Sequence, residues 1–124
     1  MPPTAWFVRA AGVSGAAAVG LGAAGAHALP KLHREKGLDA AATVQYAKIF
    51  ETANKYHLVH AVALLGAARA RRPALTAGLL ASGQALFSGS LYVVAGEGSR
   101  EIAAAKTAPI GGGLLILGWL SFLL

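Results

Sequence analysis

The chain has 124 residues, of which 56% are hydrophobic and only 13% are charged. A soluble domain carries about 25% charged residues, so this chain has too few charges to face water over its whole surface. It has no cysteine, which excludes disulfide scaffolds, cysteine-ligated metal sites and thiol catalysis. The net charge of +6 lies in short segments between long uncharged runs, which is unlike a nucleic-acid-binding face. The composition therefore predicts a single membrane domain with no nucleic-acid partner.

Long uncharged runs mark the candidate membrane spans. A helix needs roughly 20 mostly apolar residues to cross a bilayer. Three runs without Asp, Glu, Lys or Arg are long enough or nearly so, at Ala10–Pro30, Pro73–Gly96 and Thr107–Leu124. With the helix described next, the predicted spans cover about residues 6–29, 49–70, 73–95 and 107–124.

A further span is expected between the first two runs. The uncharged run Tyr56–Ala68 is too short to span alone, but no Gly or Pro occurs from residue 40 to 65, which favours one helix over about 40–70. Asp39 is the expected N-cap, and Glu51 and Lys55 are spaced for an i, i+4 ion pair. The half over about residues 40–53 is amphipathic, so we expect it to lie in the membrane interface.

These segments predict an all-α fold, a four-helix transmembrane bundle with up-down-up-down topology, in which the amphipathic interfacial half extends the second helix. An even number of spans puts both termini on one side. Trp6 opens the first span and Trp119 closes the last, and tryptophan favours the membrane interface, so both are expected at the same interface.

Small residues recur in the first span with a period of four. In lipid, such stripes are typical of close helix packing, because there is little hydrophobic drive between helices. The pattern leaves open whether the partner helix belongs to this chain or to another. The predicted lipid- or partner-contact stripe consists of Gly12, Ala16, Gly20 and Ala24. A second stripe in the third span consists of Ala77, Ala81, Ala85 and Gly89, and the fourth span opens with Pro109 and Gly111, Gly112 and Gly113.

Three histidines are the main ionisable groups expected at membrane depth. His27 ends the first span, while His57 and His60 lie three residues apart in the second, so we expect all three in the same half of the bilayer. The favoured interpretation is that neutral imidazoles bridge helices by hydrogen bonds. Proton or quinone handling is an alternative, and haem held by His27 with His57 or His60 is another. No metal site, cofactor or catalytic residue is predicted.

Two further features could contact lipid or a partner. Gln84 lies near the middle of the third span, where it could line a polar path or, more commonly, form a helix–helix hydrogen bond. Arg69, Arg71 and Arg72 form a basic turn. That turn predicts a contact with an anionic lipid such as cardiolipin or with an acidic partner loop, the alternative being a simple topology anchor.

Five blocks of sequence, in the same order, resemble the transmembrane protein 256 family, the eukaryotic branch of a widespread group of small bacterial membrane proteins of unknown function. The resemblance covers nearly the whole chain and departs from the family at residues 31–42 and 97–107. It implies a small multi-span protein in the mitochondrion and brings no established activity. The blocks are Gly25–Ala28, Ala53–Leu65, Leu79–Gly83, Leu86–Tyr92, and Ala108–Gly112 with Leu117–Trp119.

The chain has few residues that could carry out chemistry and many small residues suited to close helix packing, which favours a non-enzymatic protein. We expect a multi-pass accessory subunit of a respiratory complex in the mitochondrial inner membrane, with lipids and other membrane subunits as partners. One alternative is an oligomeric transporter or channel for protons or small solutes, with Gln84, Ser88 and the histidines along its path. Another is a redox protein that binds quinone or haem.

Overall fold

The described part of the chain, residues 5–124, is a helical bundle without strands in the computed structural model. This confirms the predicted all-α class. Its elements are α1 (Ala5–His27), α2 (Leu29–Glu35), α3 (Ala40–Ala67), α4 (Pro73–Glu97), α5 (Ala104–Leu120) and a 3₁₀ turn, η1 (Ser121–Leu123).

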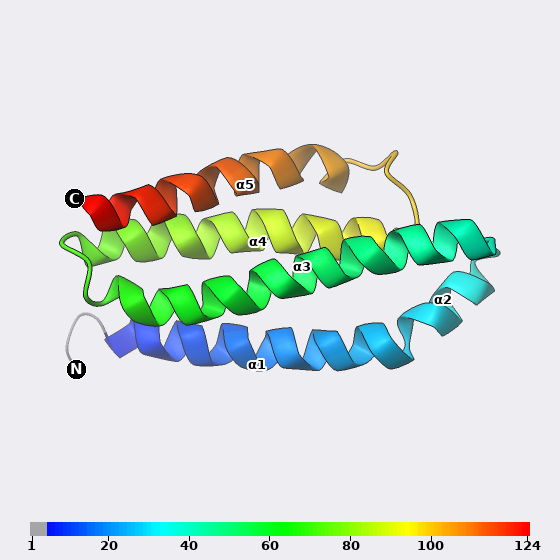
Figure 1. Cartoon of the computed structure of the whole chain (residues 1–124), viewed down its shortest axis with the longest axis horizontal. Helices are drawn as coiled ribbons and strands as arrows, with labels where there is room; N and C mark the ends of the chain where they lie inside the picture. The colour runs from blue at the N-terminus through cyan, green and yellow to red at the C-terminus, as the bar shows by residue number, and fades with distance from the viewer. Residues whose placement is uncertain (1–4) are drawn as a thin grey trace.

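The four long helices alternate in direction along one common axis (Figure 1). α1 and α4 run one way and α3 and α5 the other, so that the start of α1 and the end of α5 lie at the same end of the molecule. The short helix α2 makes the turn at the opposite end. The up-down-up-down topology predicted from the sequence is therefore confirmed.

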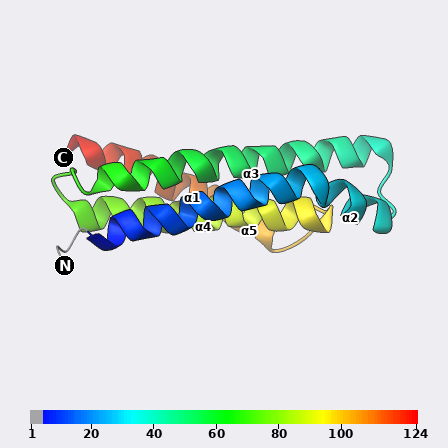
Figure 2. The same ribbon diagram turned by 90° about the horizontal axis from the view of Figure 1, so that it is seen from below.

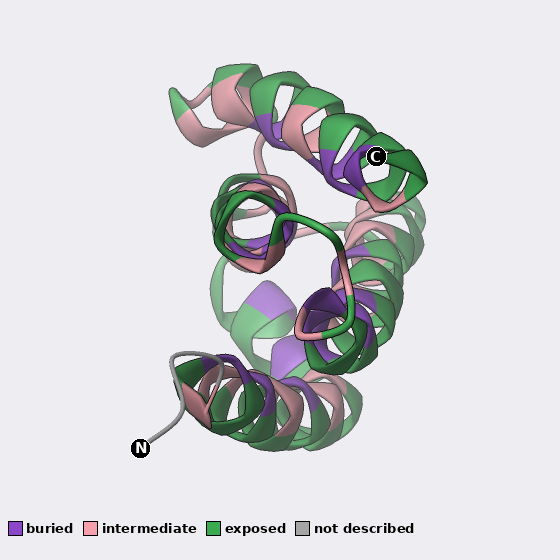
Figure 3. Ribbon diagram, turned by 90° about the vertical axis from the view of Figure 1, so that its left-hand side faces the viewer, coloured by how far each residue is buried: buried purple, intermediate pink, exposed green. Residues whose placement is uncertain are grey.

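The long helices pack in chain order: extensive contacts join α1 with α3, α3 with α4, and α4 with α5. Seen from below, α1 passes in front of α3 and α4 (Figure 2), and its extensive contacts are with α3. Seen along the axis, buried residues line the inner sides of the helices (Figure 3). The core lies towards the end that holds the termini. It consists of Phe7, Ala11, Ala63, Leu64, Ala67, Ala77, Leu80 and Leu115.

Local sequence signals set the helix ends. The Asp39 side chain accepts a hydrogen bond from the Ala42 amide at 2.8 Å, which confirms the predicted N-cap of α3. α4 starts at Pro73, and it ends at Glu97 because Gly98, the residue after it, has a φ of +66°, a left-handed conformation that favours glycine. α5 starts before the expected residue 107, because alanines with high helix propensity precede it, and Pro109 lies inside it.

The ion pairs differ from the expected i, i+4 pair. Glu51 and Lys55 do not form a salt bridge, and instead Lys36 Nζ lies 3.5 Å from Glu97 Oε2, which joins the end of α2 to the end of α4. Lys36 and Glu97 are both partly exposed, so the pair contributes at most about 1 kcal/mol to stability.

Glycines let α4 and α5 approach each other closely. A Cβ atom at Gly111 would overlap the backbone of Leu86 and Phe87, and one at Gly83 would lie 2.9 Å from the Leu115 amide nitrogen. The close approach expected at the start of the fourth span is thus confirmed. Hydroxyl pairs also link these elements, with Thr76 Oγ1 2.7 Å from Ser121 Oγ of η1 and a hydrogen bond between Ser90 and Thr107.

Three helical segments are long and apolar enough to cross a membrane: Ala5–His27, Pro73–Glu97 and Ala104–Leu123. α3 is more polar, and its crossing stays a prediction. It is supported by the position of α3 against both α1 and α4 over much of its length.

Substituting Gly111 by alanine should destabilise the bundle by about 1–3 kcal/mol, because the new methyl group meets backbone atoms of α4 that cannot move aside. Thermal unfolding of the purified protein in mild detergent measures the change. Gly113→Ala is the matched control, since a Cβ atom there has nothing within 4 Å. Equal unfolding temperatures for the two variants would contradict the observed contact between α4 and α5.

Candidate functional site

A chain of polar side chains runs through the interior where α1, α3 and α4 meet. We call it the polar chain and define it as Ser14, Asn54, His57, Gln84 and Tyr92. Ser14 comes from α1, Asn54 and His57 come from α3, and Gln84 and Tyr92 come from α4. All three helices are therefore joined by side-chain hydrogen bonds.

His57 is the centre of the polar chain because both of its ring nitrogens are engaged. Its Nε2 lies 3.1 Å from Ser14 Oγ, and its Nδ1 lies 3.0 Å from the Tyr92 hydroxyl. Ser14 donates to Gln84 Oε1 at 3.1 Å, so Ser14 Oγ accepts the proton on His57 Nε2. The hydroxyl of Tyr92 then donates to Nδ1. This fixes His57 as a neutral imidazole with its proton on Nε2.

Asn54 ends the polar chain on the other side. Its Nδ2 donates to the Tyr92 hydroxyl at 3.1 Å and to the backbone carbonyl of Ala18 in α1 at 2.7 Å. A Cβ atom at Gly22 would lie 2.9 Å from Asn54 Oδ1, so the absence of a side chain at Gly22 lets Asn54 reach α1. Each hydrogen bond between members of the polar chain is donated in the same direction, from Asn54 towards Gln84. Both ends are amides, and amides do not exchange protons readily.

A cavity of about 290 Å³ borders the polar chain between α1, α3 and α4. Ser14, His57, Gln84 and Tyr92 all contribute to its lining. Ser88 lines it too, one turn from Gln84, and its buried hydroxyl has no hydrogen-bond partner. A buried hydroxyl without a partner is costly, so this cavity is suited to a water molecule or another small polar molecule.

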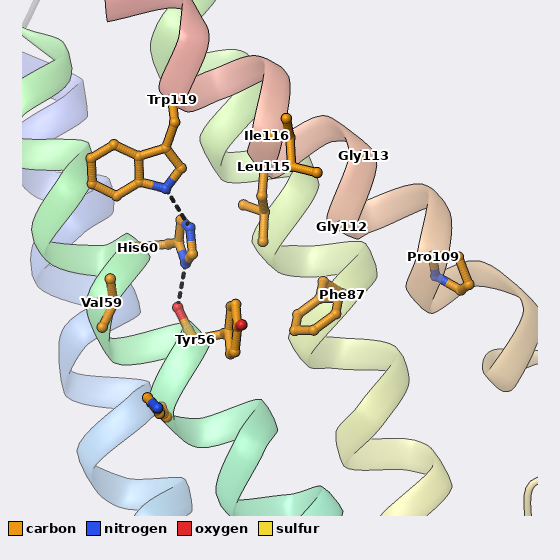
Figure 4. Close-up of a pocket in the computed structure, with 11 residues that line it drawn as sticks. Tyr56, Val59, His60, Phe87, Pro109, Gly112, Gly113, Leu115, Ile116 and Trp119 are labelled. Carbon is orange, nitrogen blue, oxygen red and sulfur yellow. Dashed lines mark hydrogen bonds between the residues drawn. The ribbon is translucent and has the colours of Figure 1, made fainter.

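His60 lies about 60° from His57 around the axis of α3, and its ring packs against α5 (Figure 4). Its Nδ1 donates to the carbonyl of Tyr56 at 2.6 Å, and its Nε2 accepts the indole N–H of Trp119 at 2.9 Å. His60 is 3% exposed, and both nitrogens are used. It therefore bridges α3 and α5 as a second neutral imidazole, with the opposite tautomer from His57.

The three histidines expected in one half of the bilayer have different surroundings in the structure. His27 is exposed at the end of α1, His57 faces α1 and α4, and His60 faces α5. A haem held by His27 together with His57 or His60 does not fit this arrangement. Among residues 5–124, no three His, Asp or Glu side chains come together as a metal site.

The structure gives the orientation of the α1 stripe, which the sequence left open, and the bonding of Gln84. Gly12, Ala16, Gly20 and Ala24 all face outward, because α1 packs on the bundle through Phe7, Ala11 and Ala18 instead. Gln84 is buried and accepts a hydrogen bond from Ser14, so it forms the helix–helix hydrogen bond that was the more common interpretation of its position. In the second stripe Ala77 is buried, while Ala81, Ala85 and Gly89 line the polar cavity.

The arginine turn lies exposed at the end of the molecule that holds the termini. Arg69, Arg71 and Arg72 are all exposed. Arg71 donates to the carbonyl of Leu124 at 3.3 Å, while Arg69 and Arg72 form no ion pair with any residue in the described part of the chain. The guanidinium groups of Arg69 and Arg72 are therefore available to an anionic group at this membrane surface.

Sequence reasoning missed two polar residues that the structure makes central. Ser14 lies within the small-residue run of α1 and gave no signal of its own. His33 in α2 is fully buried, its Nε2 donates to the Ala95 carbonyl at 2.7 Å, and its Nδ1 has no partner. The i, i+4 spacing of Leu29 and His33, both buried on one face of α2, is the signal that could have found it.

Comparison with known proteins gives one consistent family. The model of a family described as protein of unknown function (DUF423) matches residues 21–112. A UPF0382 membrane protein of Bacillus subtilis is 33% identical, over 92% of this chain and 89% of its own. One from Haemophilus influenzae is 32% identical over 93% and 88%, and one from Schizosaccharomyces pombe is 32% identical over 97% and 98%. No solved structure matches the chain significantly.

Replacing His57 by leucine should destabilise the protein by about 1–2 kcal/mol, because two interhelical hydrogen bonds are lost and the Ser14 and Tyr92 hydroxyls lose their partner. Unfolding by titrated denaturing detergent, followed by circular dichroism, measures the difference. His27→Leu is the matched control and should leave stability unchanged, since His27 is exposed. A His57 variant as stable as the His27 variant would contradict a structural role for the polar chain.

Proposed function

Because the chain belongs to the DUF423 family, whose curated relatives are named UPF0382 membrane proteins, we propose that it is a non-enzymatic membrane protein that assembles with another membrane-embedded protein. The contact surface we propose is the outer face of α1, defined by Gly12, Ala16, Gly20 and Ala24.

The observation that carries this proposal is the direction in which the α1 stripe faces. A Cβ atom at Gly12 or Gly20 would meet nothing within 4 Å, although both glycines lie in a helix where glycine costs about 1 kcal/mol relative to alanine. Within the bundle α1 is held by its other face, through the polar chain and Phe7. A smooth outward face lets the backbone of a second membrane helix approach closely.

The absence of enzymatic activity is proposed from the polar groups in the bundle. Both nitrogens of His57 are used in hydrogen bonds between helices, and His60 uses one nitrogen within α3 and the other towards α5, so neither imidazole is free to move a proton or bind a metal without breaking a contact. Gln84 and Asn54 are amides, which do not act as acids or bases. This supports a structural role for these groups.

More specifically, we propose an accessory subunit of a respiratory complex in the mitochondrial inner membrane. The resemblance to the transmembrane protein 256 family supports this location, and the fission-yeast relative aligns over almost its whole length. The exposed Arg69 and Arg72 suit anionic headgroups such as those of cardiolipin at the surface of that membrane.

One observation favours a second candidate function, the transport of a small polar solute. The cavity beside the polar chain holds the unpartnered hydroxyl of Ser88, and Gln84 lies one turn away. Flux of a small neutral solute into liposomes that is lost in Gln84→Leu would favour this function over the structural one. Proton conduction has less support, because the polar chain ends in an amide at each side.

The proposed assembly predicts that Gly20→Leu, in the middle of the stripe, releases the protein from its complex while leaving its own fold intact. Native gel electrophoresis of solubilised membranes measures the size of the complex, and circular dichroism checks the fold. Val19→Leu is the matched control, since Val19 is 67% exposed on the same helix but lies about 100° away from Gly20 around the helix axis. Migration of the unmodified protein only as a free species of its own 12.5 kDa mass would contradict the proposal.

A further inference from the structure

A large groove lies on the side of the bundle opposite to the polar cavity. It is formed by α3, α4 and α5 and has a volume of about 660 Å³, within the range of small-molecule sites. In Figure 4 its lining side chains project from α3 on one side and from α5 on the other, with Phe87 of α4 between them. The groove contains no part of the polar chain.

The groove is a wedge that runs parallel to the helices. Trp119 and His60 close one end with their hydrogen bond, and α5 diverges from α3 towards Pro109 at the other end (Figure 4). Ten residues of α5 separate Pro109 from Trp119, which corresponds to about 15 Å at 1.5 Å per residue. In a membrane this long axis follows the bilayer normal, the direction in which lipid acyl chains lie.

The walls of the groove are apolar and aromatic. The Tyr56 and Phe87 rings lie 4.8 Å apart between centroids, and the His60 and Trp119 rings lie 5.9 Å apart. Gly112 and Gly113 leave the α5 wall without bulky side chains near Pro109, and a Cβ atom at Gly113 would meet nothing within 4 Å. These walls suit a long hydrocarbon chain.

Among residues 5–124, Lys55 is the single charged residue that lines the groove, and no acidic residue accompanies it. Glu51, one turn earlier, forms no salt bridge with Lys55 and lines a different cavity, beside Gly22 and Asn54. Lys48 belongs to the half of α3 that is predicted to lie in the membrane interface, and Lys55 follows it by seven residues, or about 10 Å along the helix. The flexible side chain of Lys55 can therefore extend its ammonium group towards that interface. The groove therefore combines one positive group with an apolar channel.

We propose that this groove binds an anionic amphiphile, with the carboxylate or phosphate at the Lys55 ammonium and the acyl chain along the groove towards Trp119. The charge of Lys55 selects an anion, and the length and direction of the groove select a linear chain. A free fatty acid and an acidic phospholipid share this chemistry. The site is separate from the α1 face, so it does not depend on the proposed assembly.

A quinone ring fits the groove less well. In this groove the His60 N–H is already donated to the Tyr56 carbonyl, and the Trp119 N–H is donated to His60. The donors left for a quinone carbonyl are the Tyr56 hydroxyl and the Lys55 ammonium, and Lys55, the only cation of the described lining, favours a full negative charge over a neutral carbonyl.

Quenching of Trp119 fluorescence tests the site in the full chain. Trp6→Phe removes the other tryptophan, and the protein is placed in phosphatidylcholine nanodiscs with increasing dibromostearate, whose bromine atoms quench only at short range. We expect saturable quenching, and the concentration for half-quenching should rise roughly tenfold in Lys55→Gln, the change that follows when a charged hydrogen bond is lost. Brominated phosphatidylglycerol in a parallel series tells an acidic phospholipid from a fatty acid.

The controls separate specific binding from partition into the bilayer. Lys48 lies on the same helix but lines a different cavity, so the Lys48→Gln variant should leave quenching unchanged. Gly113→Leu, which fills the groove, should abolish saturable quenching while circular dichroism stays that of the parent. Equal quenching by brominated phosphatidylcholine, or no change in Lys55→Gln, would overturn the proposal. Displacement of dibromostearate by decylubiquinone but not by stearate would also overturn it.

Discussion

The absence of a strong hydrophobic drive between helices in lipid is the constraint on which this structure depends. Helices must then be held by close backbone contact and by hydrogen bonds between polar side chains. This chain uses the two devices at different interfaces. Glycine contacts hold α5 against α4, at Gly83 and Gly111, while the polar chain through His57 ties α1 to α3 and α4. Both depend on α4, which contacts α3 on one side and α5 on the other.

α3 borders both the polar cavity and the apolar groove. His57 and His60 are three residues apart, which places them about 60° apart around the helix axis. That angle is small enough to predict a shared face from the sequence, yet it directs one ring to α1 and α4 and the other to α5. Packing in chain order therefore leaves a polar cavity between α1, α3 and α4 and an apolar groove between α3, α4 and α5.

Much of the architecture could be predicted because charge spacing and helix signals act locally. The alternating topology and the Asp39 cap are confirmed. The direction in which α1 faces could not be predicted, because a small-residue stripe has the same period whether it faces the bundle or the lipid. Ser14 decides the matter by bonding to Gln84 and His57, and a lone serine in an alanine-rich run carries no signal. Long-range pairing, not periodicity, defines the candidate site.

Disulfide trapping in native membranes tests most directly the claim that the polar face of α1 points inward. The chain has no cysteine, so an introduced pair has no competing thiols. Oxidation of the double variant with cysteines in place of Gly15, which follows Ser14, and Ala61 should give an efficient intramolecular cross-link, because the two Cβ atoms would lie 4.0 Å apart. A pair at Gly12 and Ala61 should give none, since a Cβ atom at Gly12 has nothing within 4 Å. Cross-linking at Gly12 in preference to Gly15 would contradict the account.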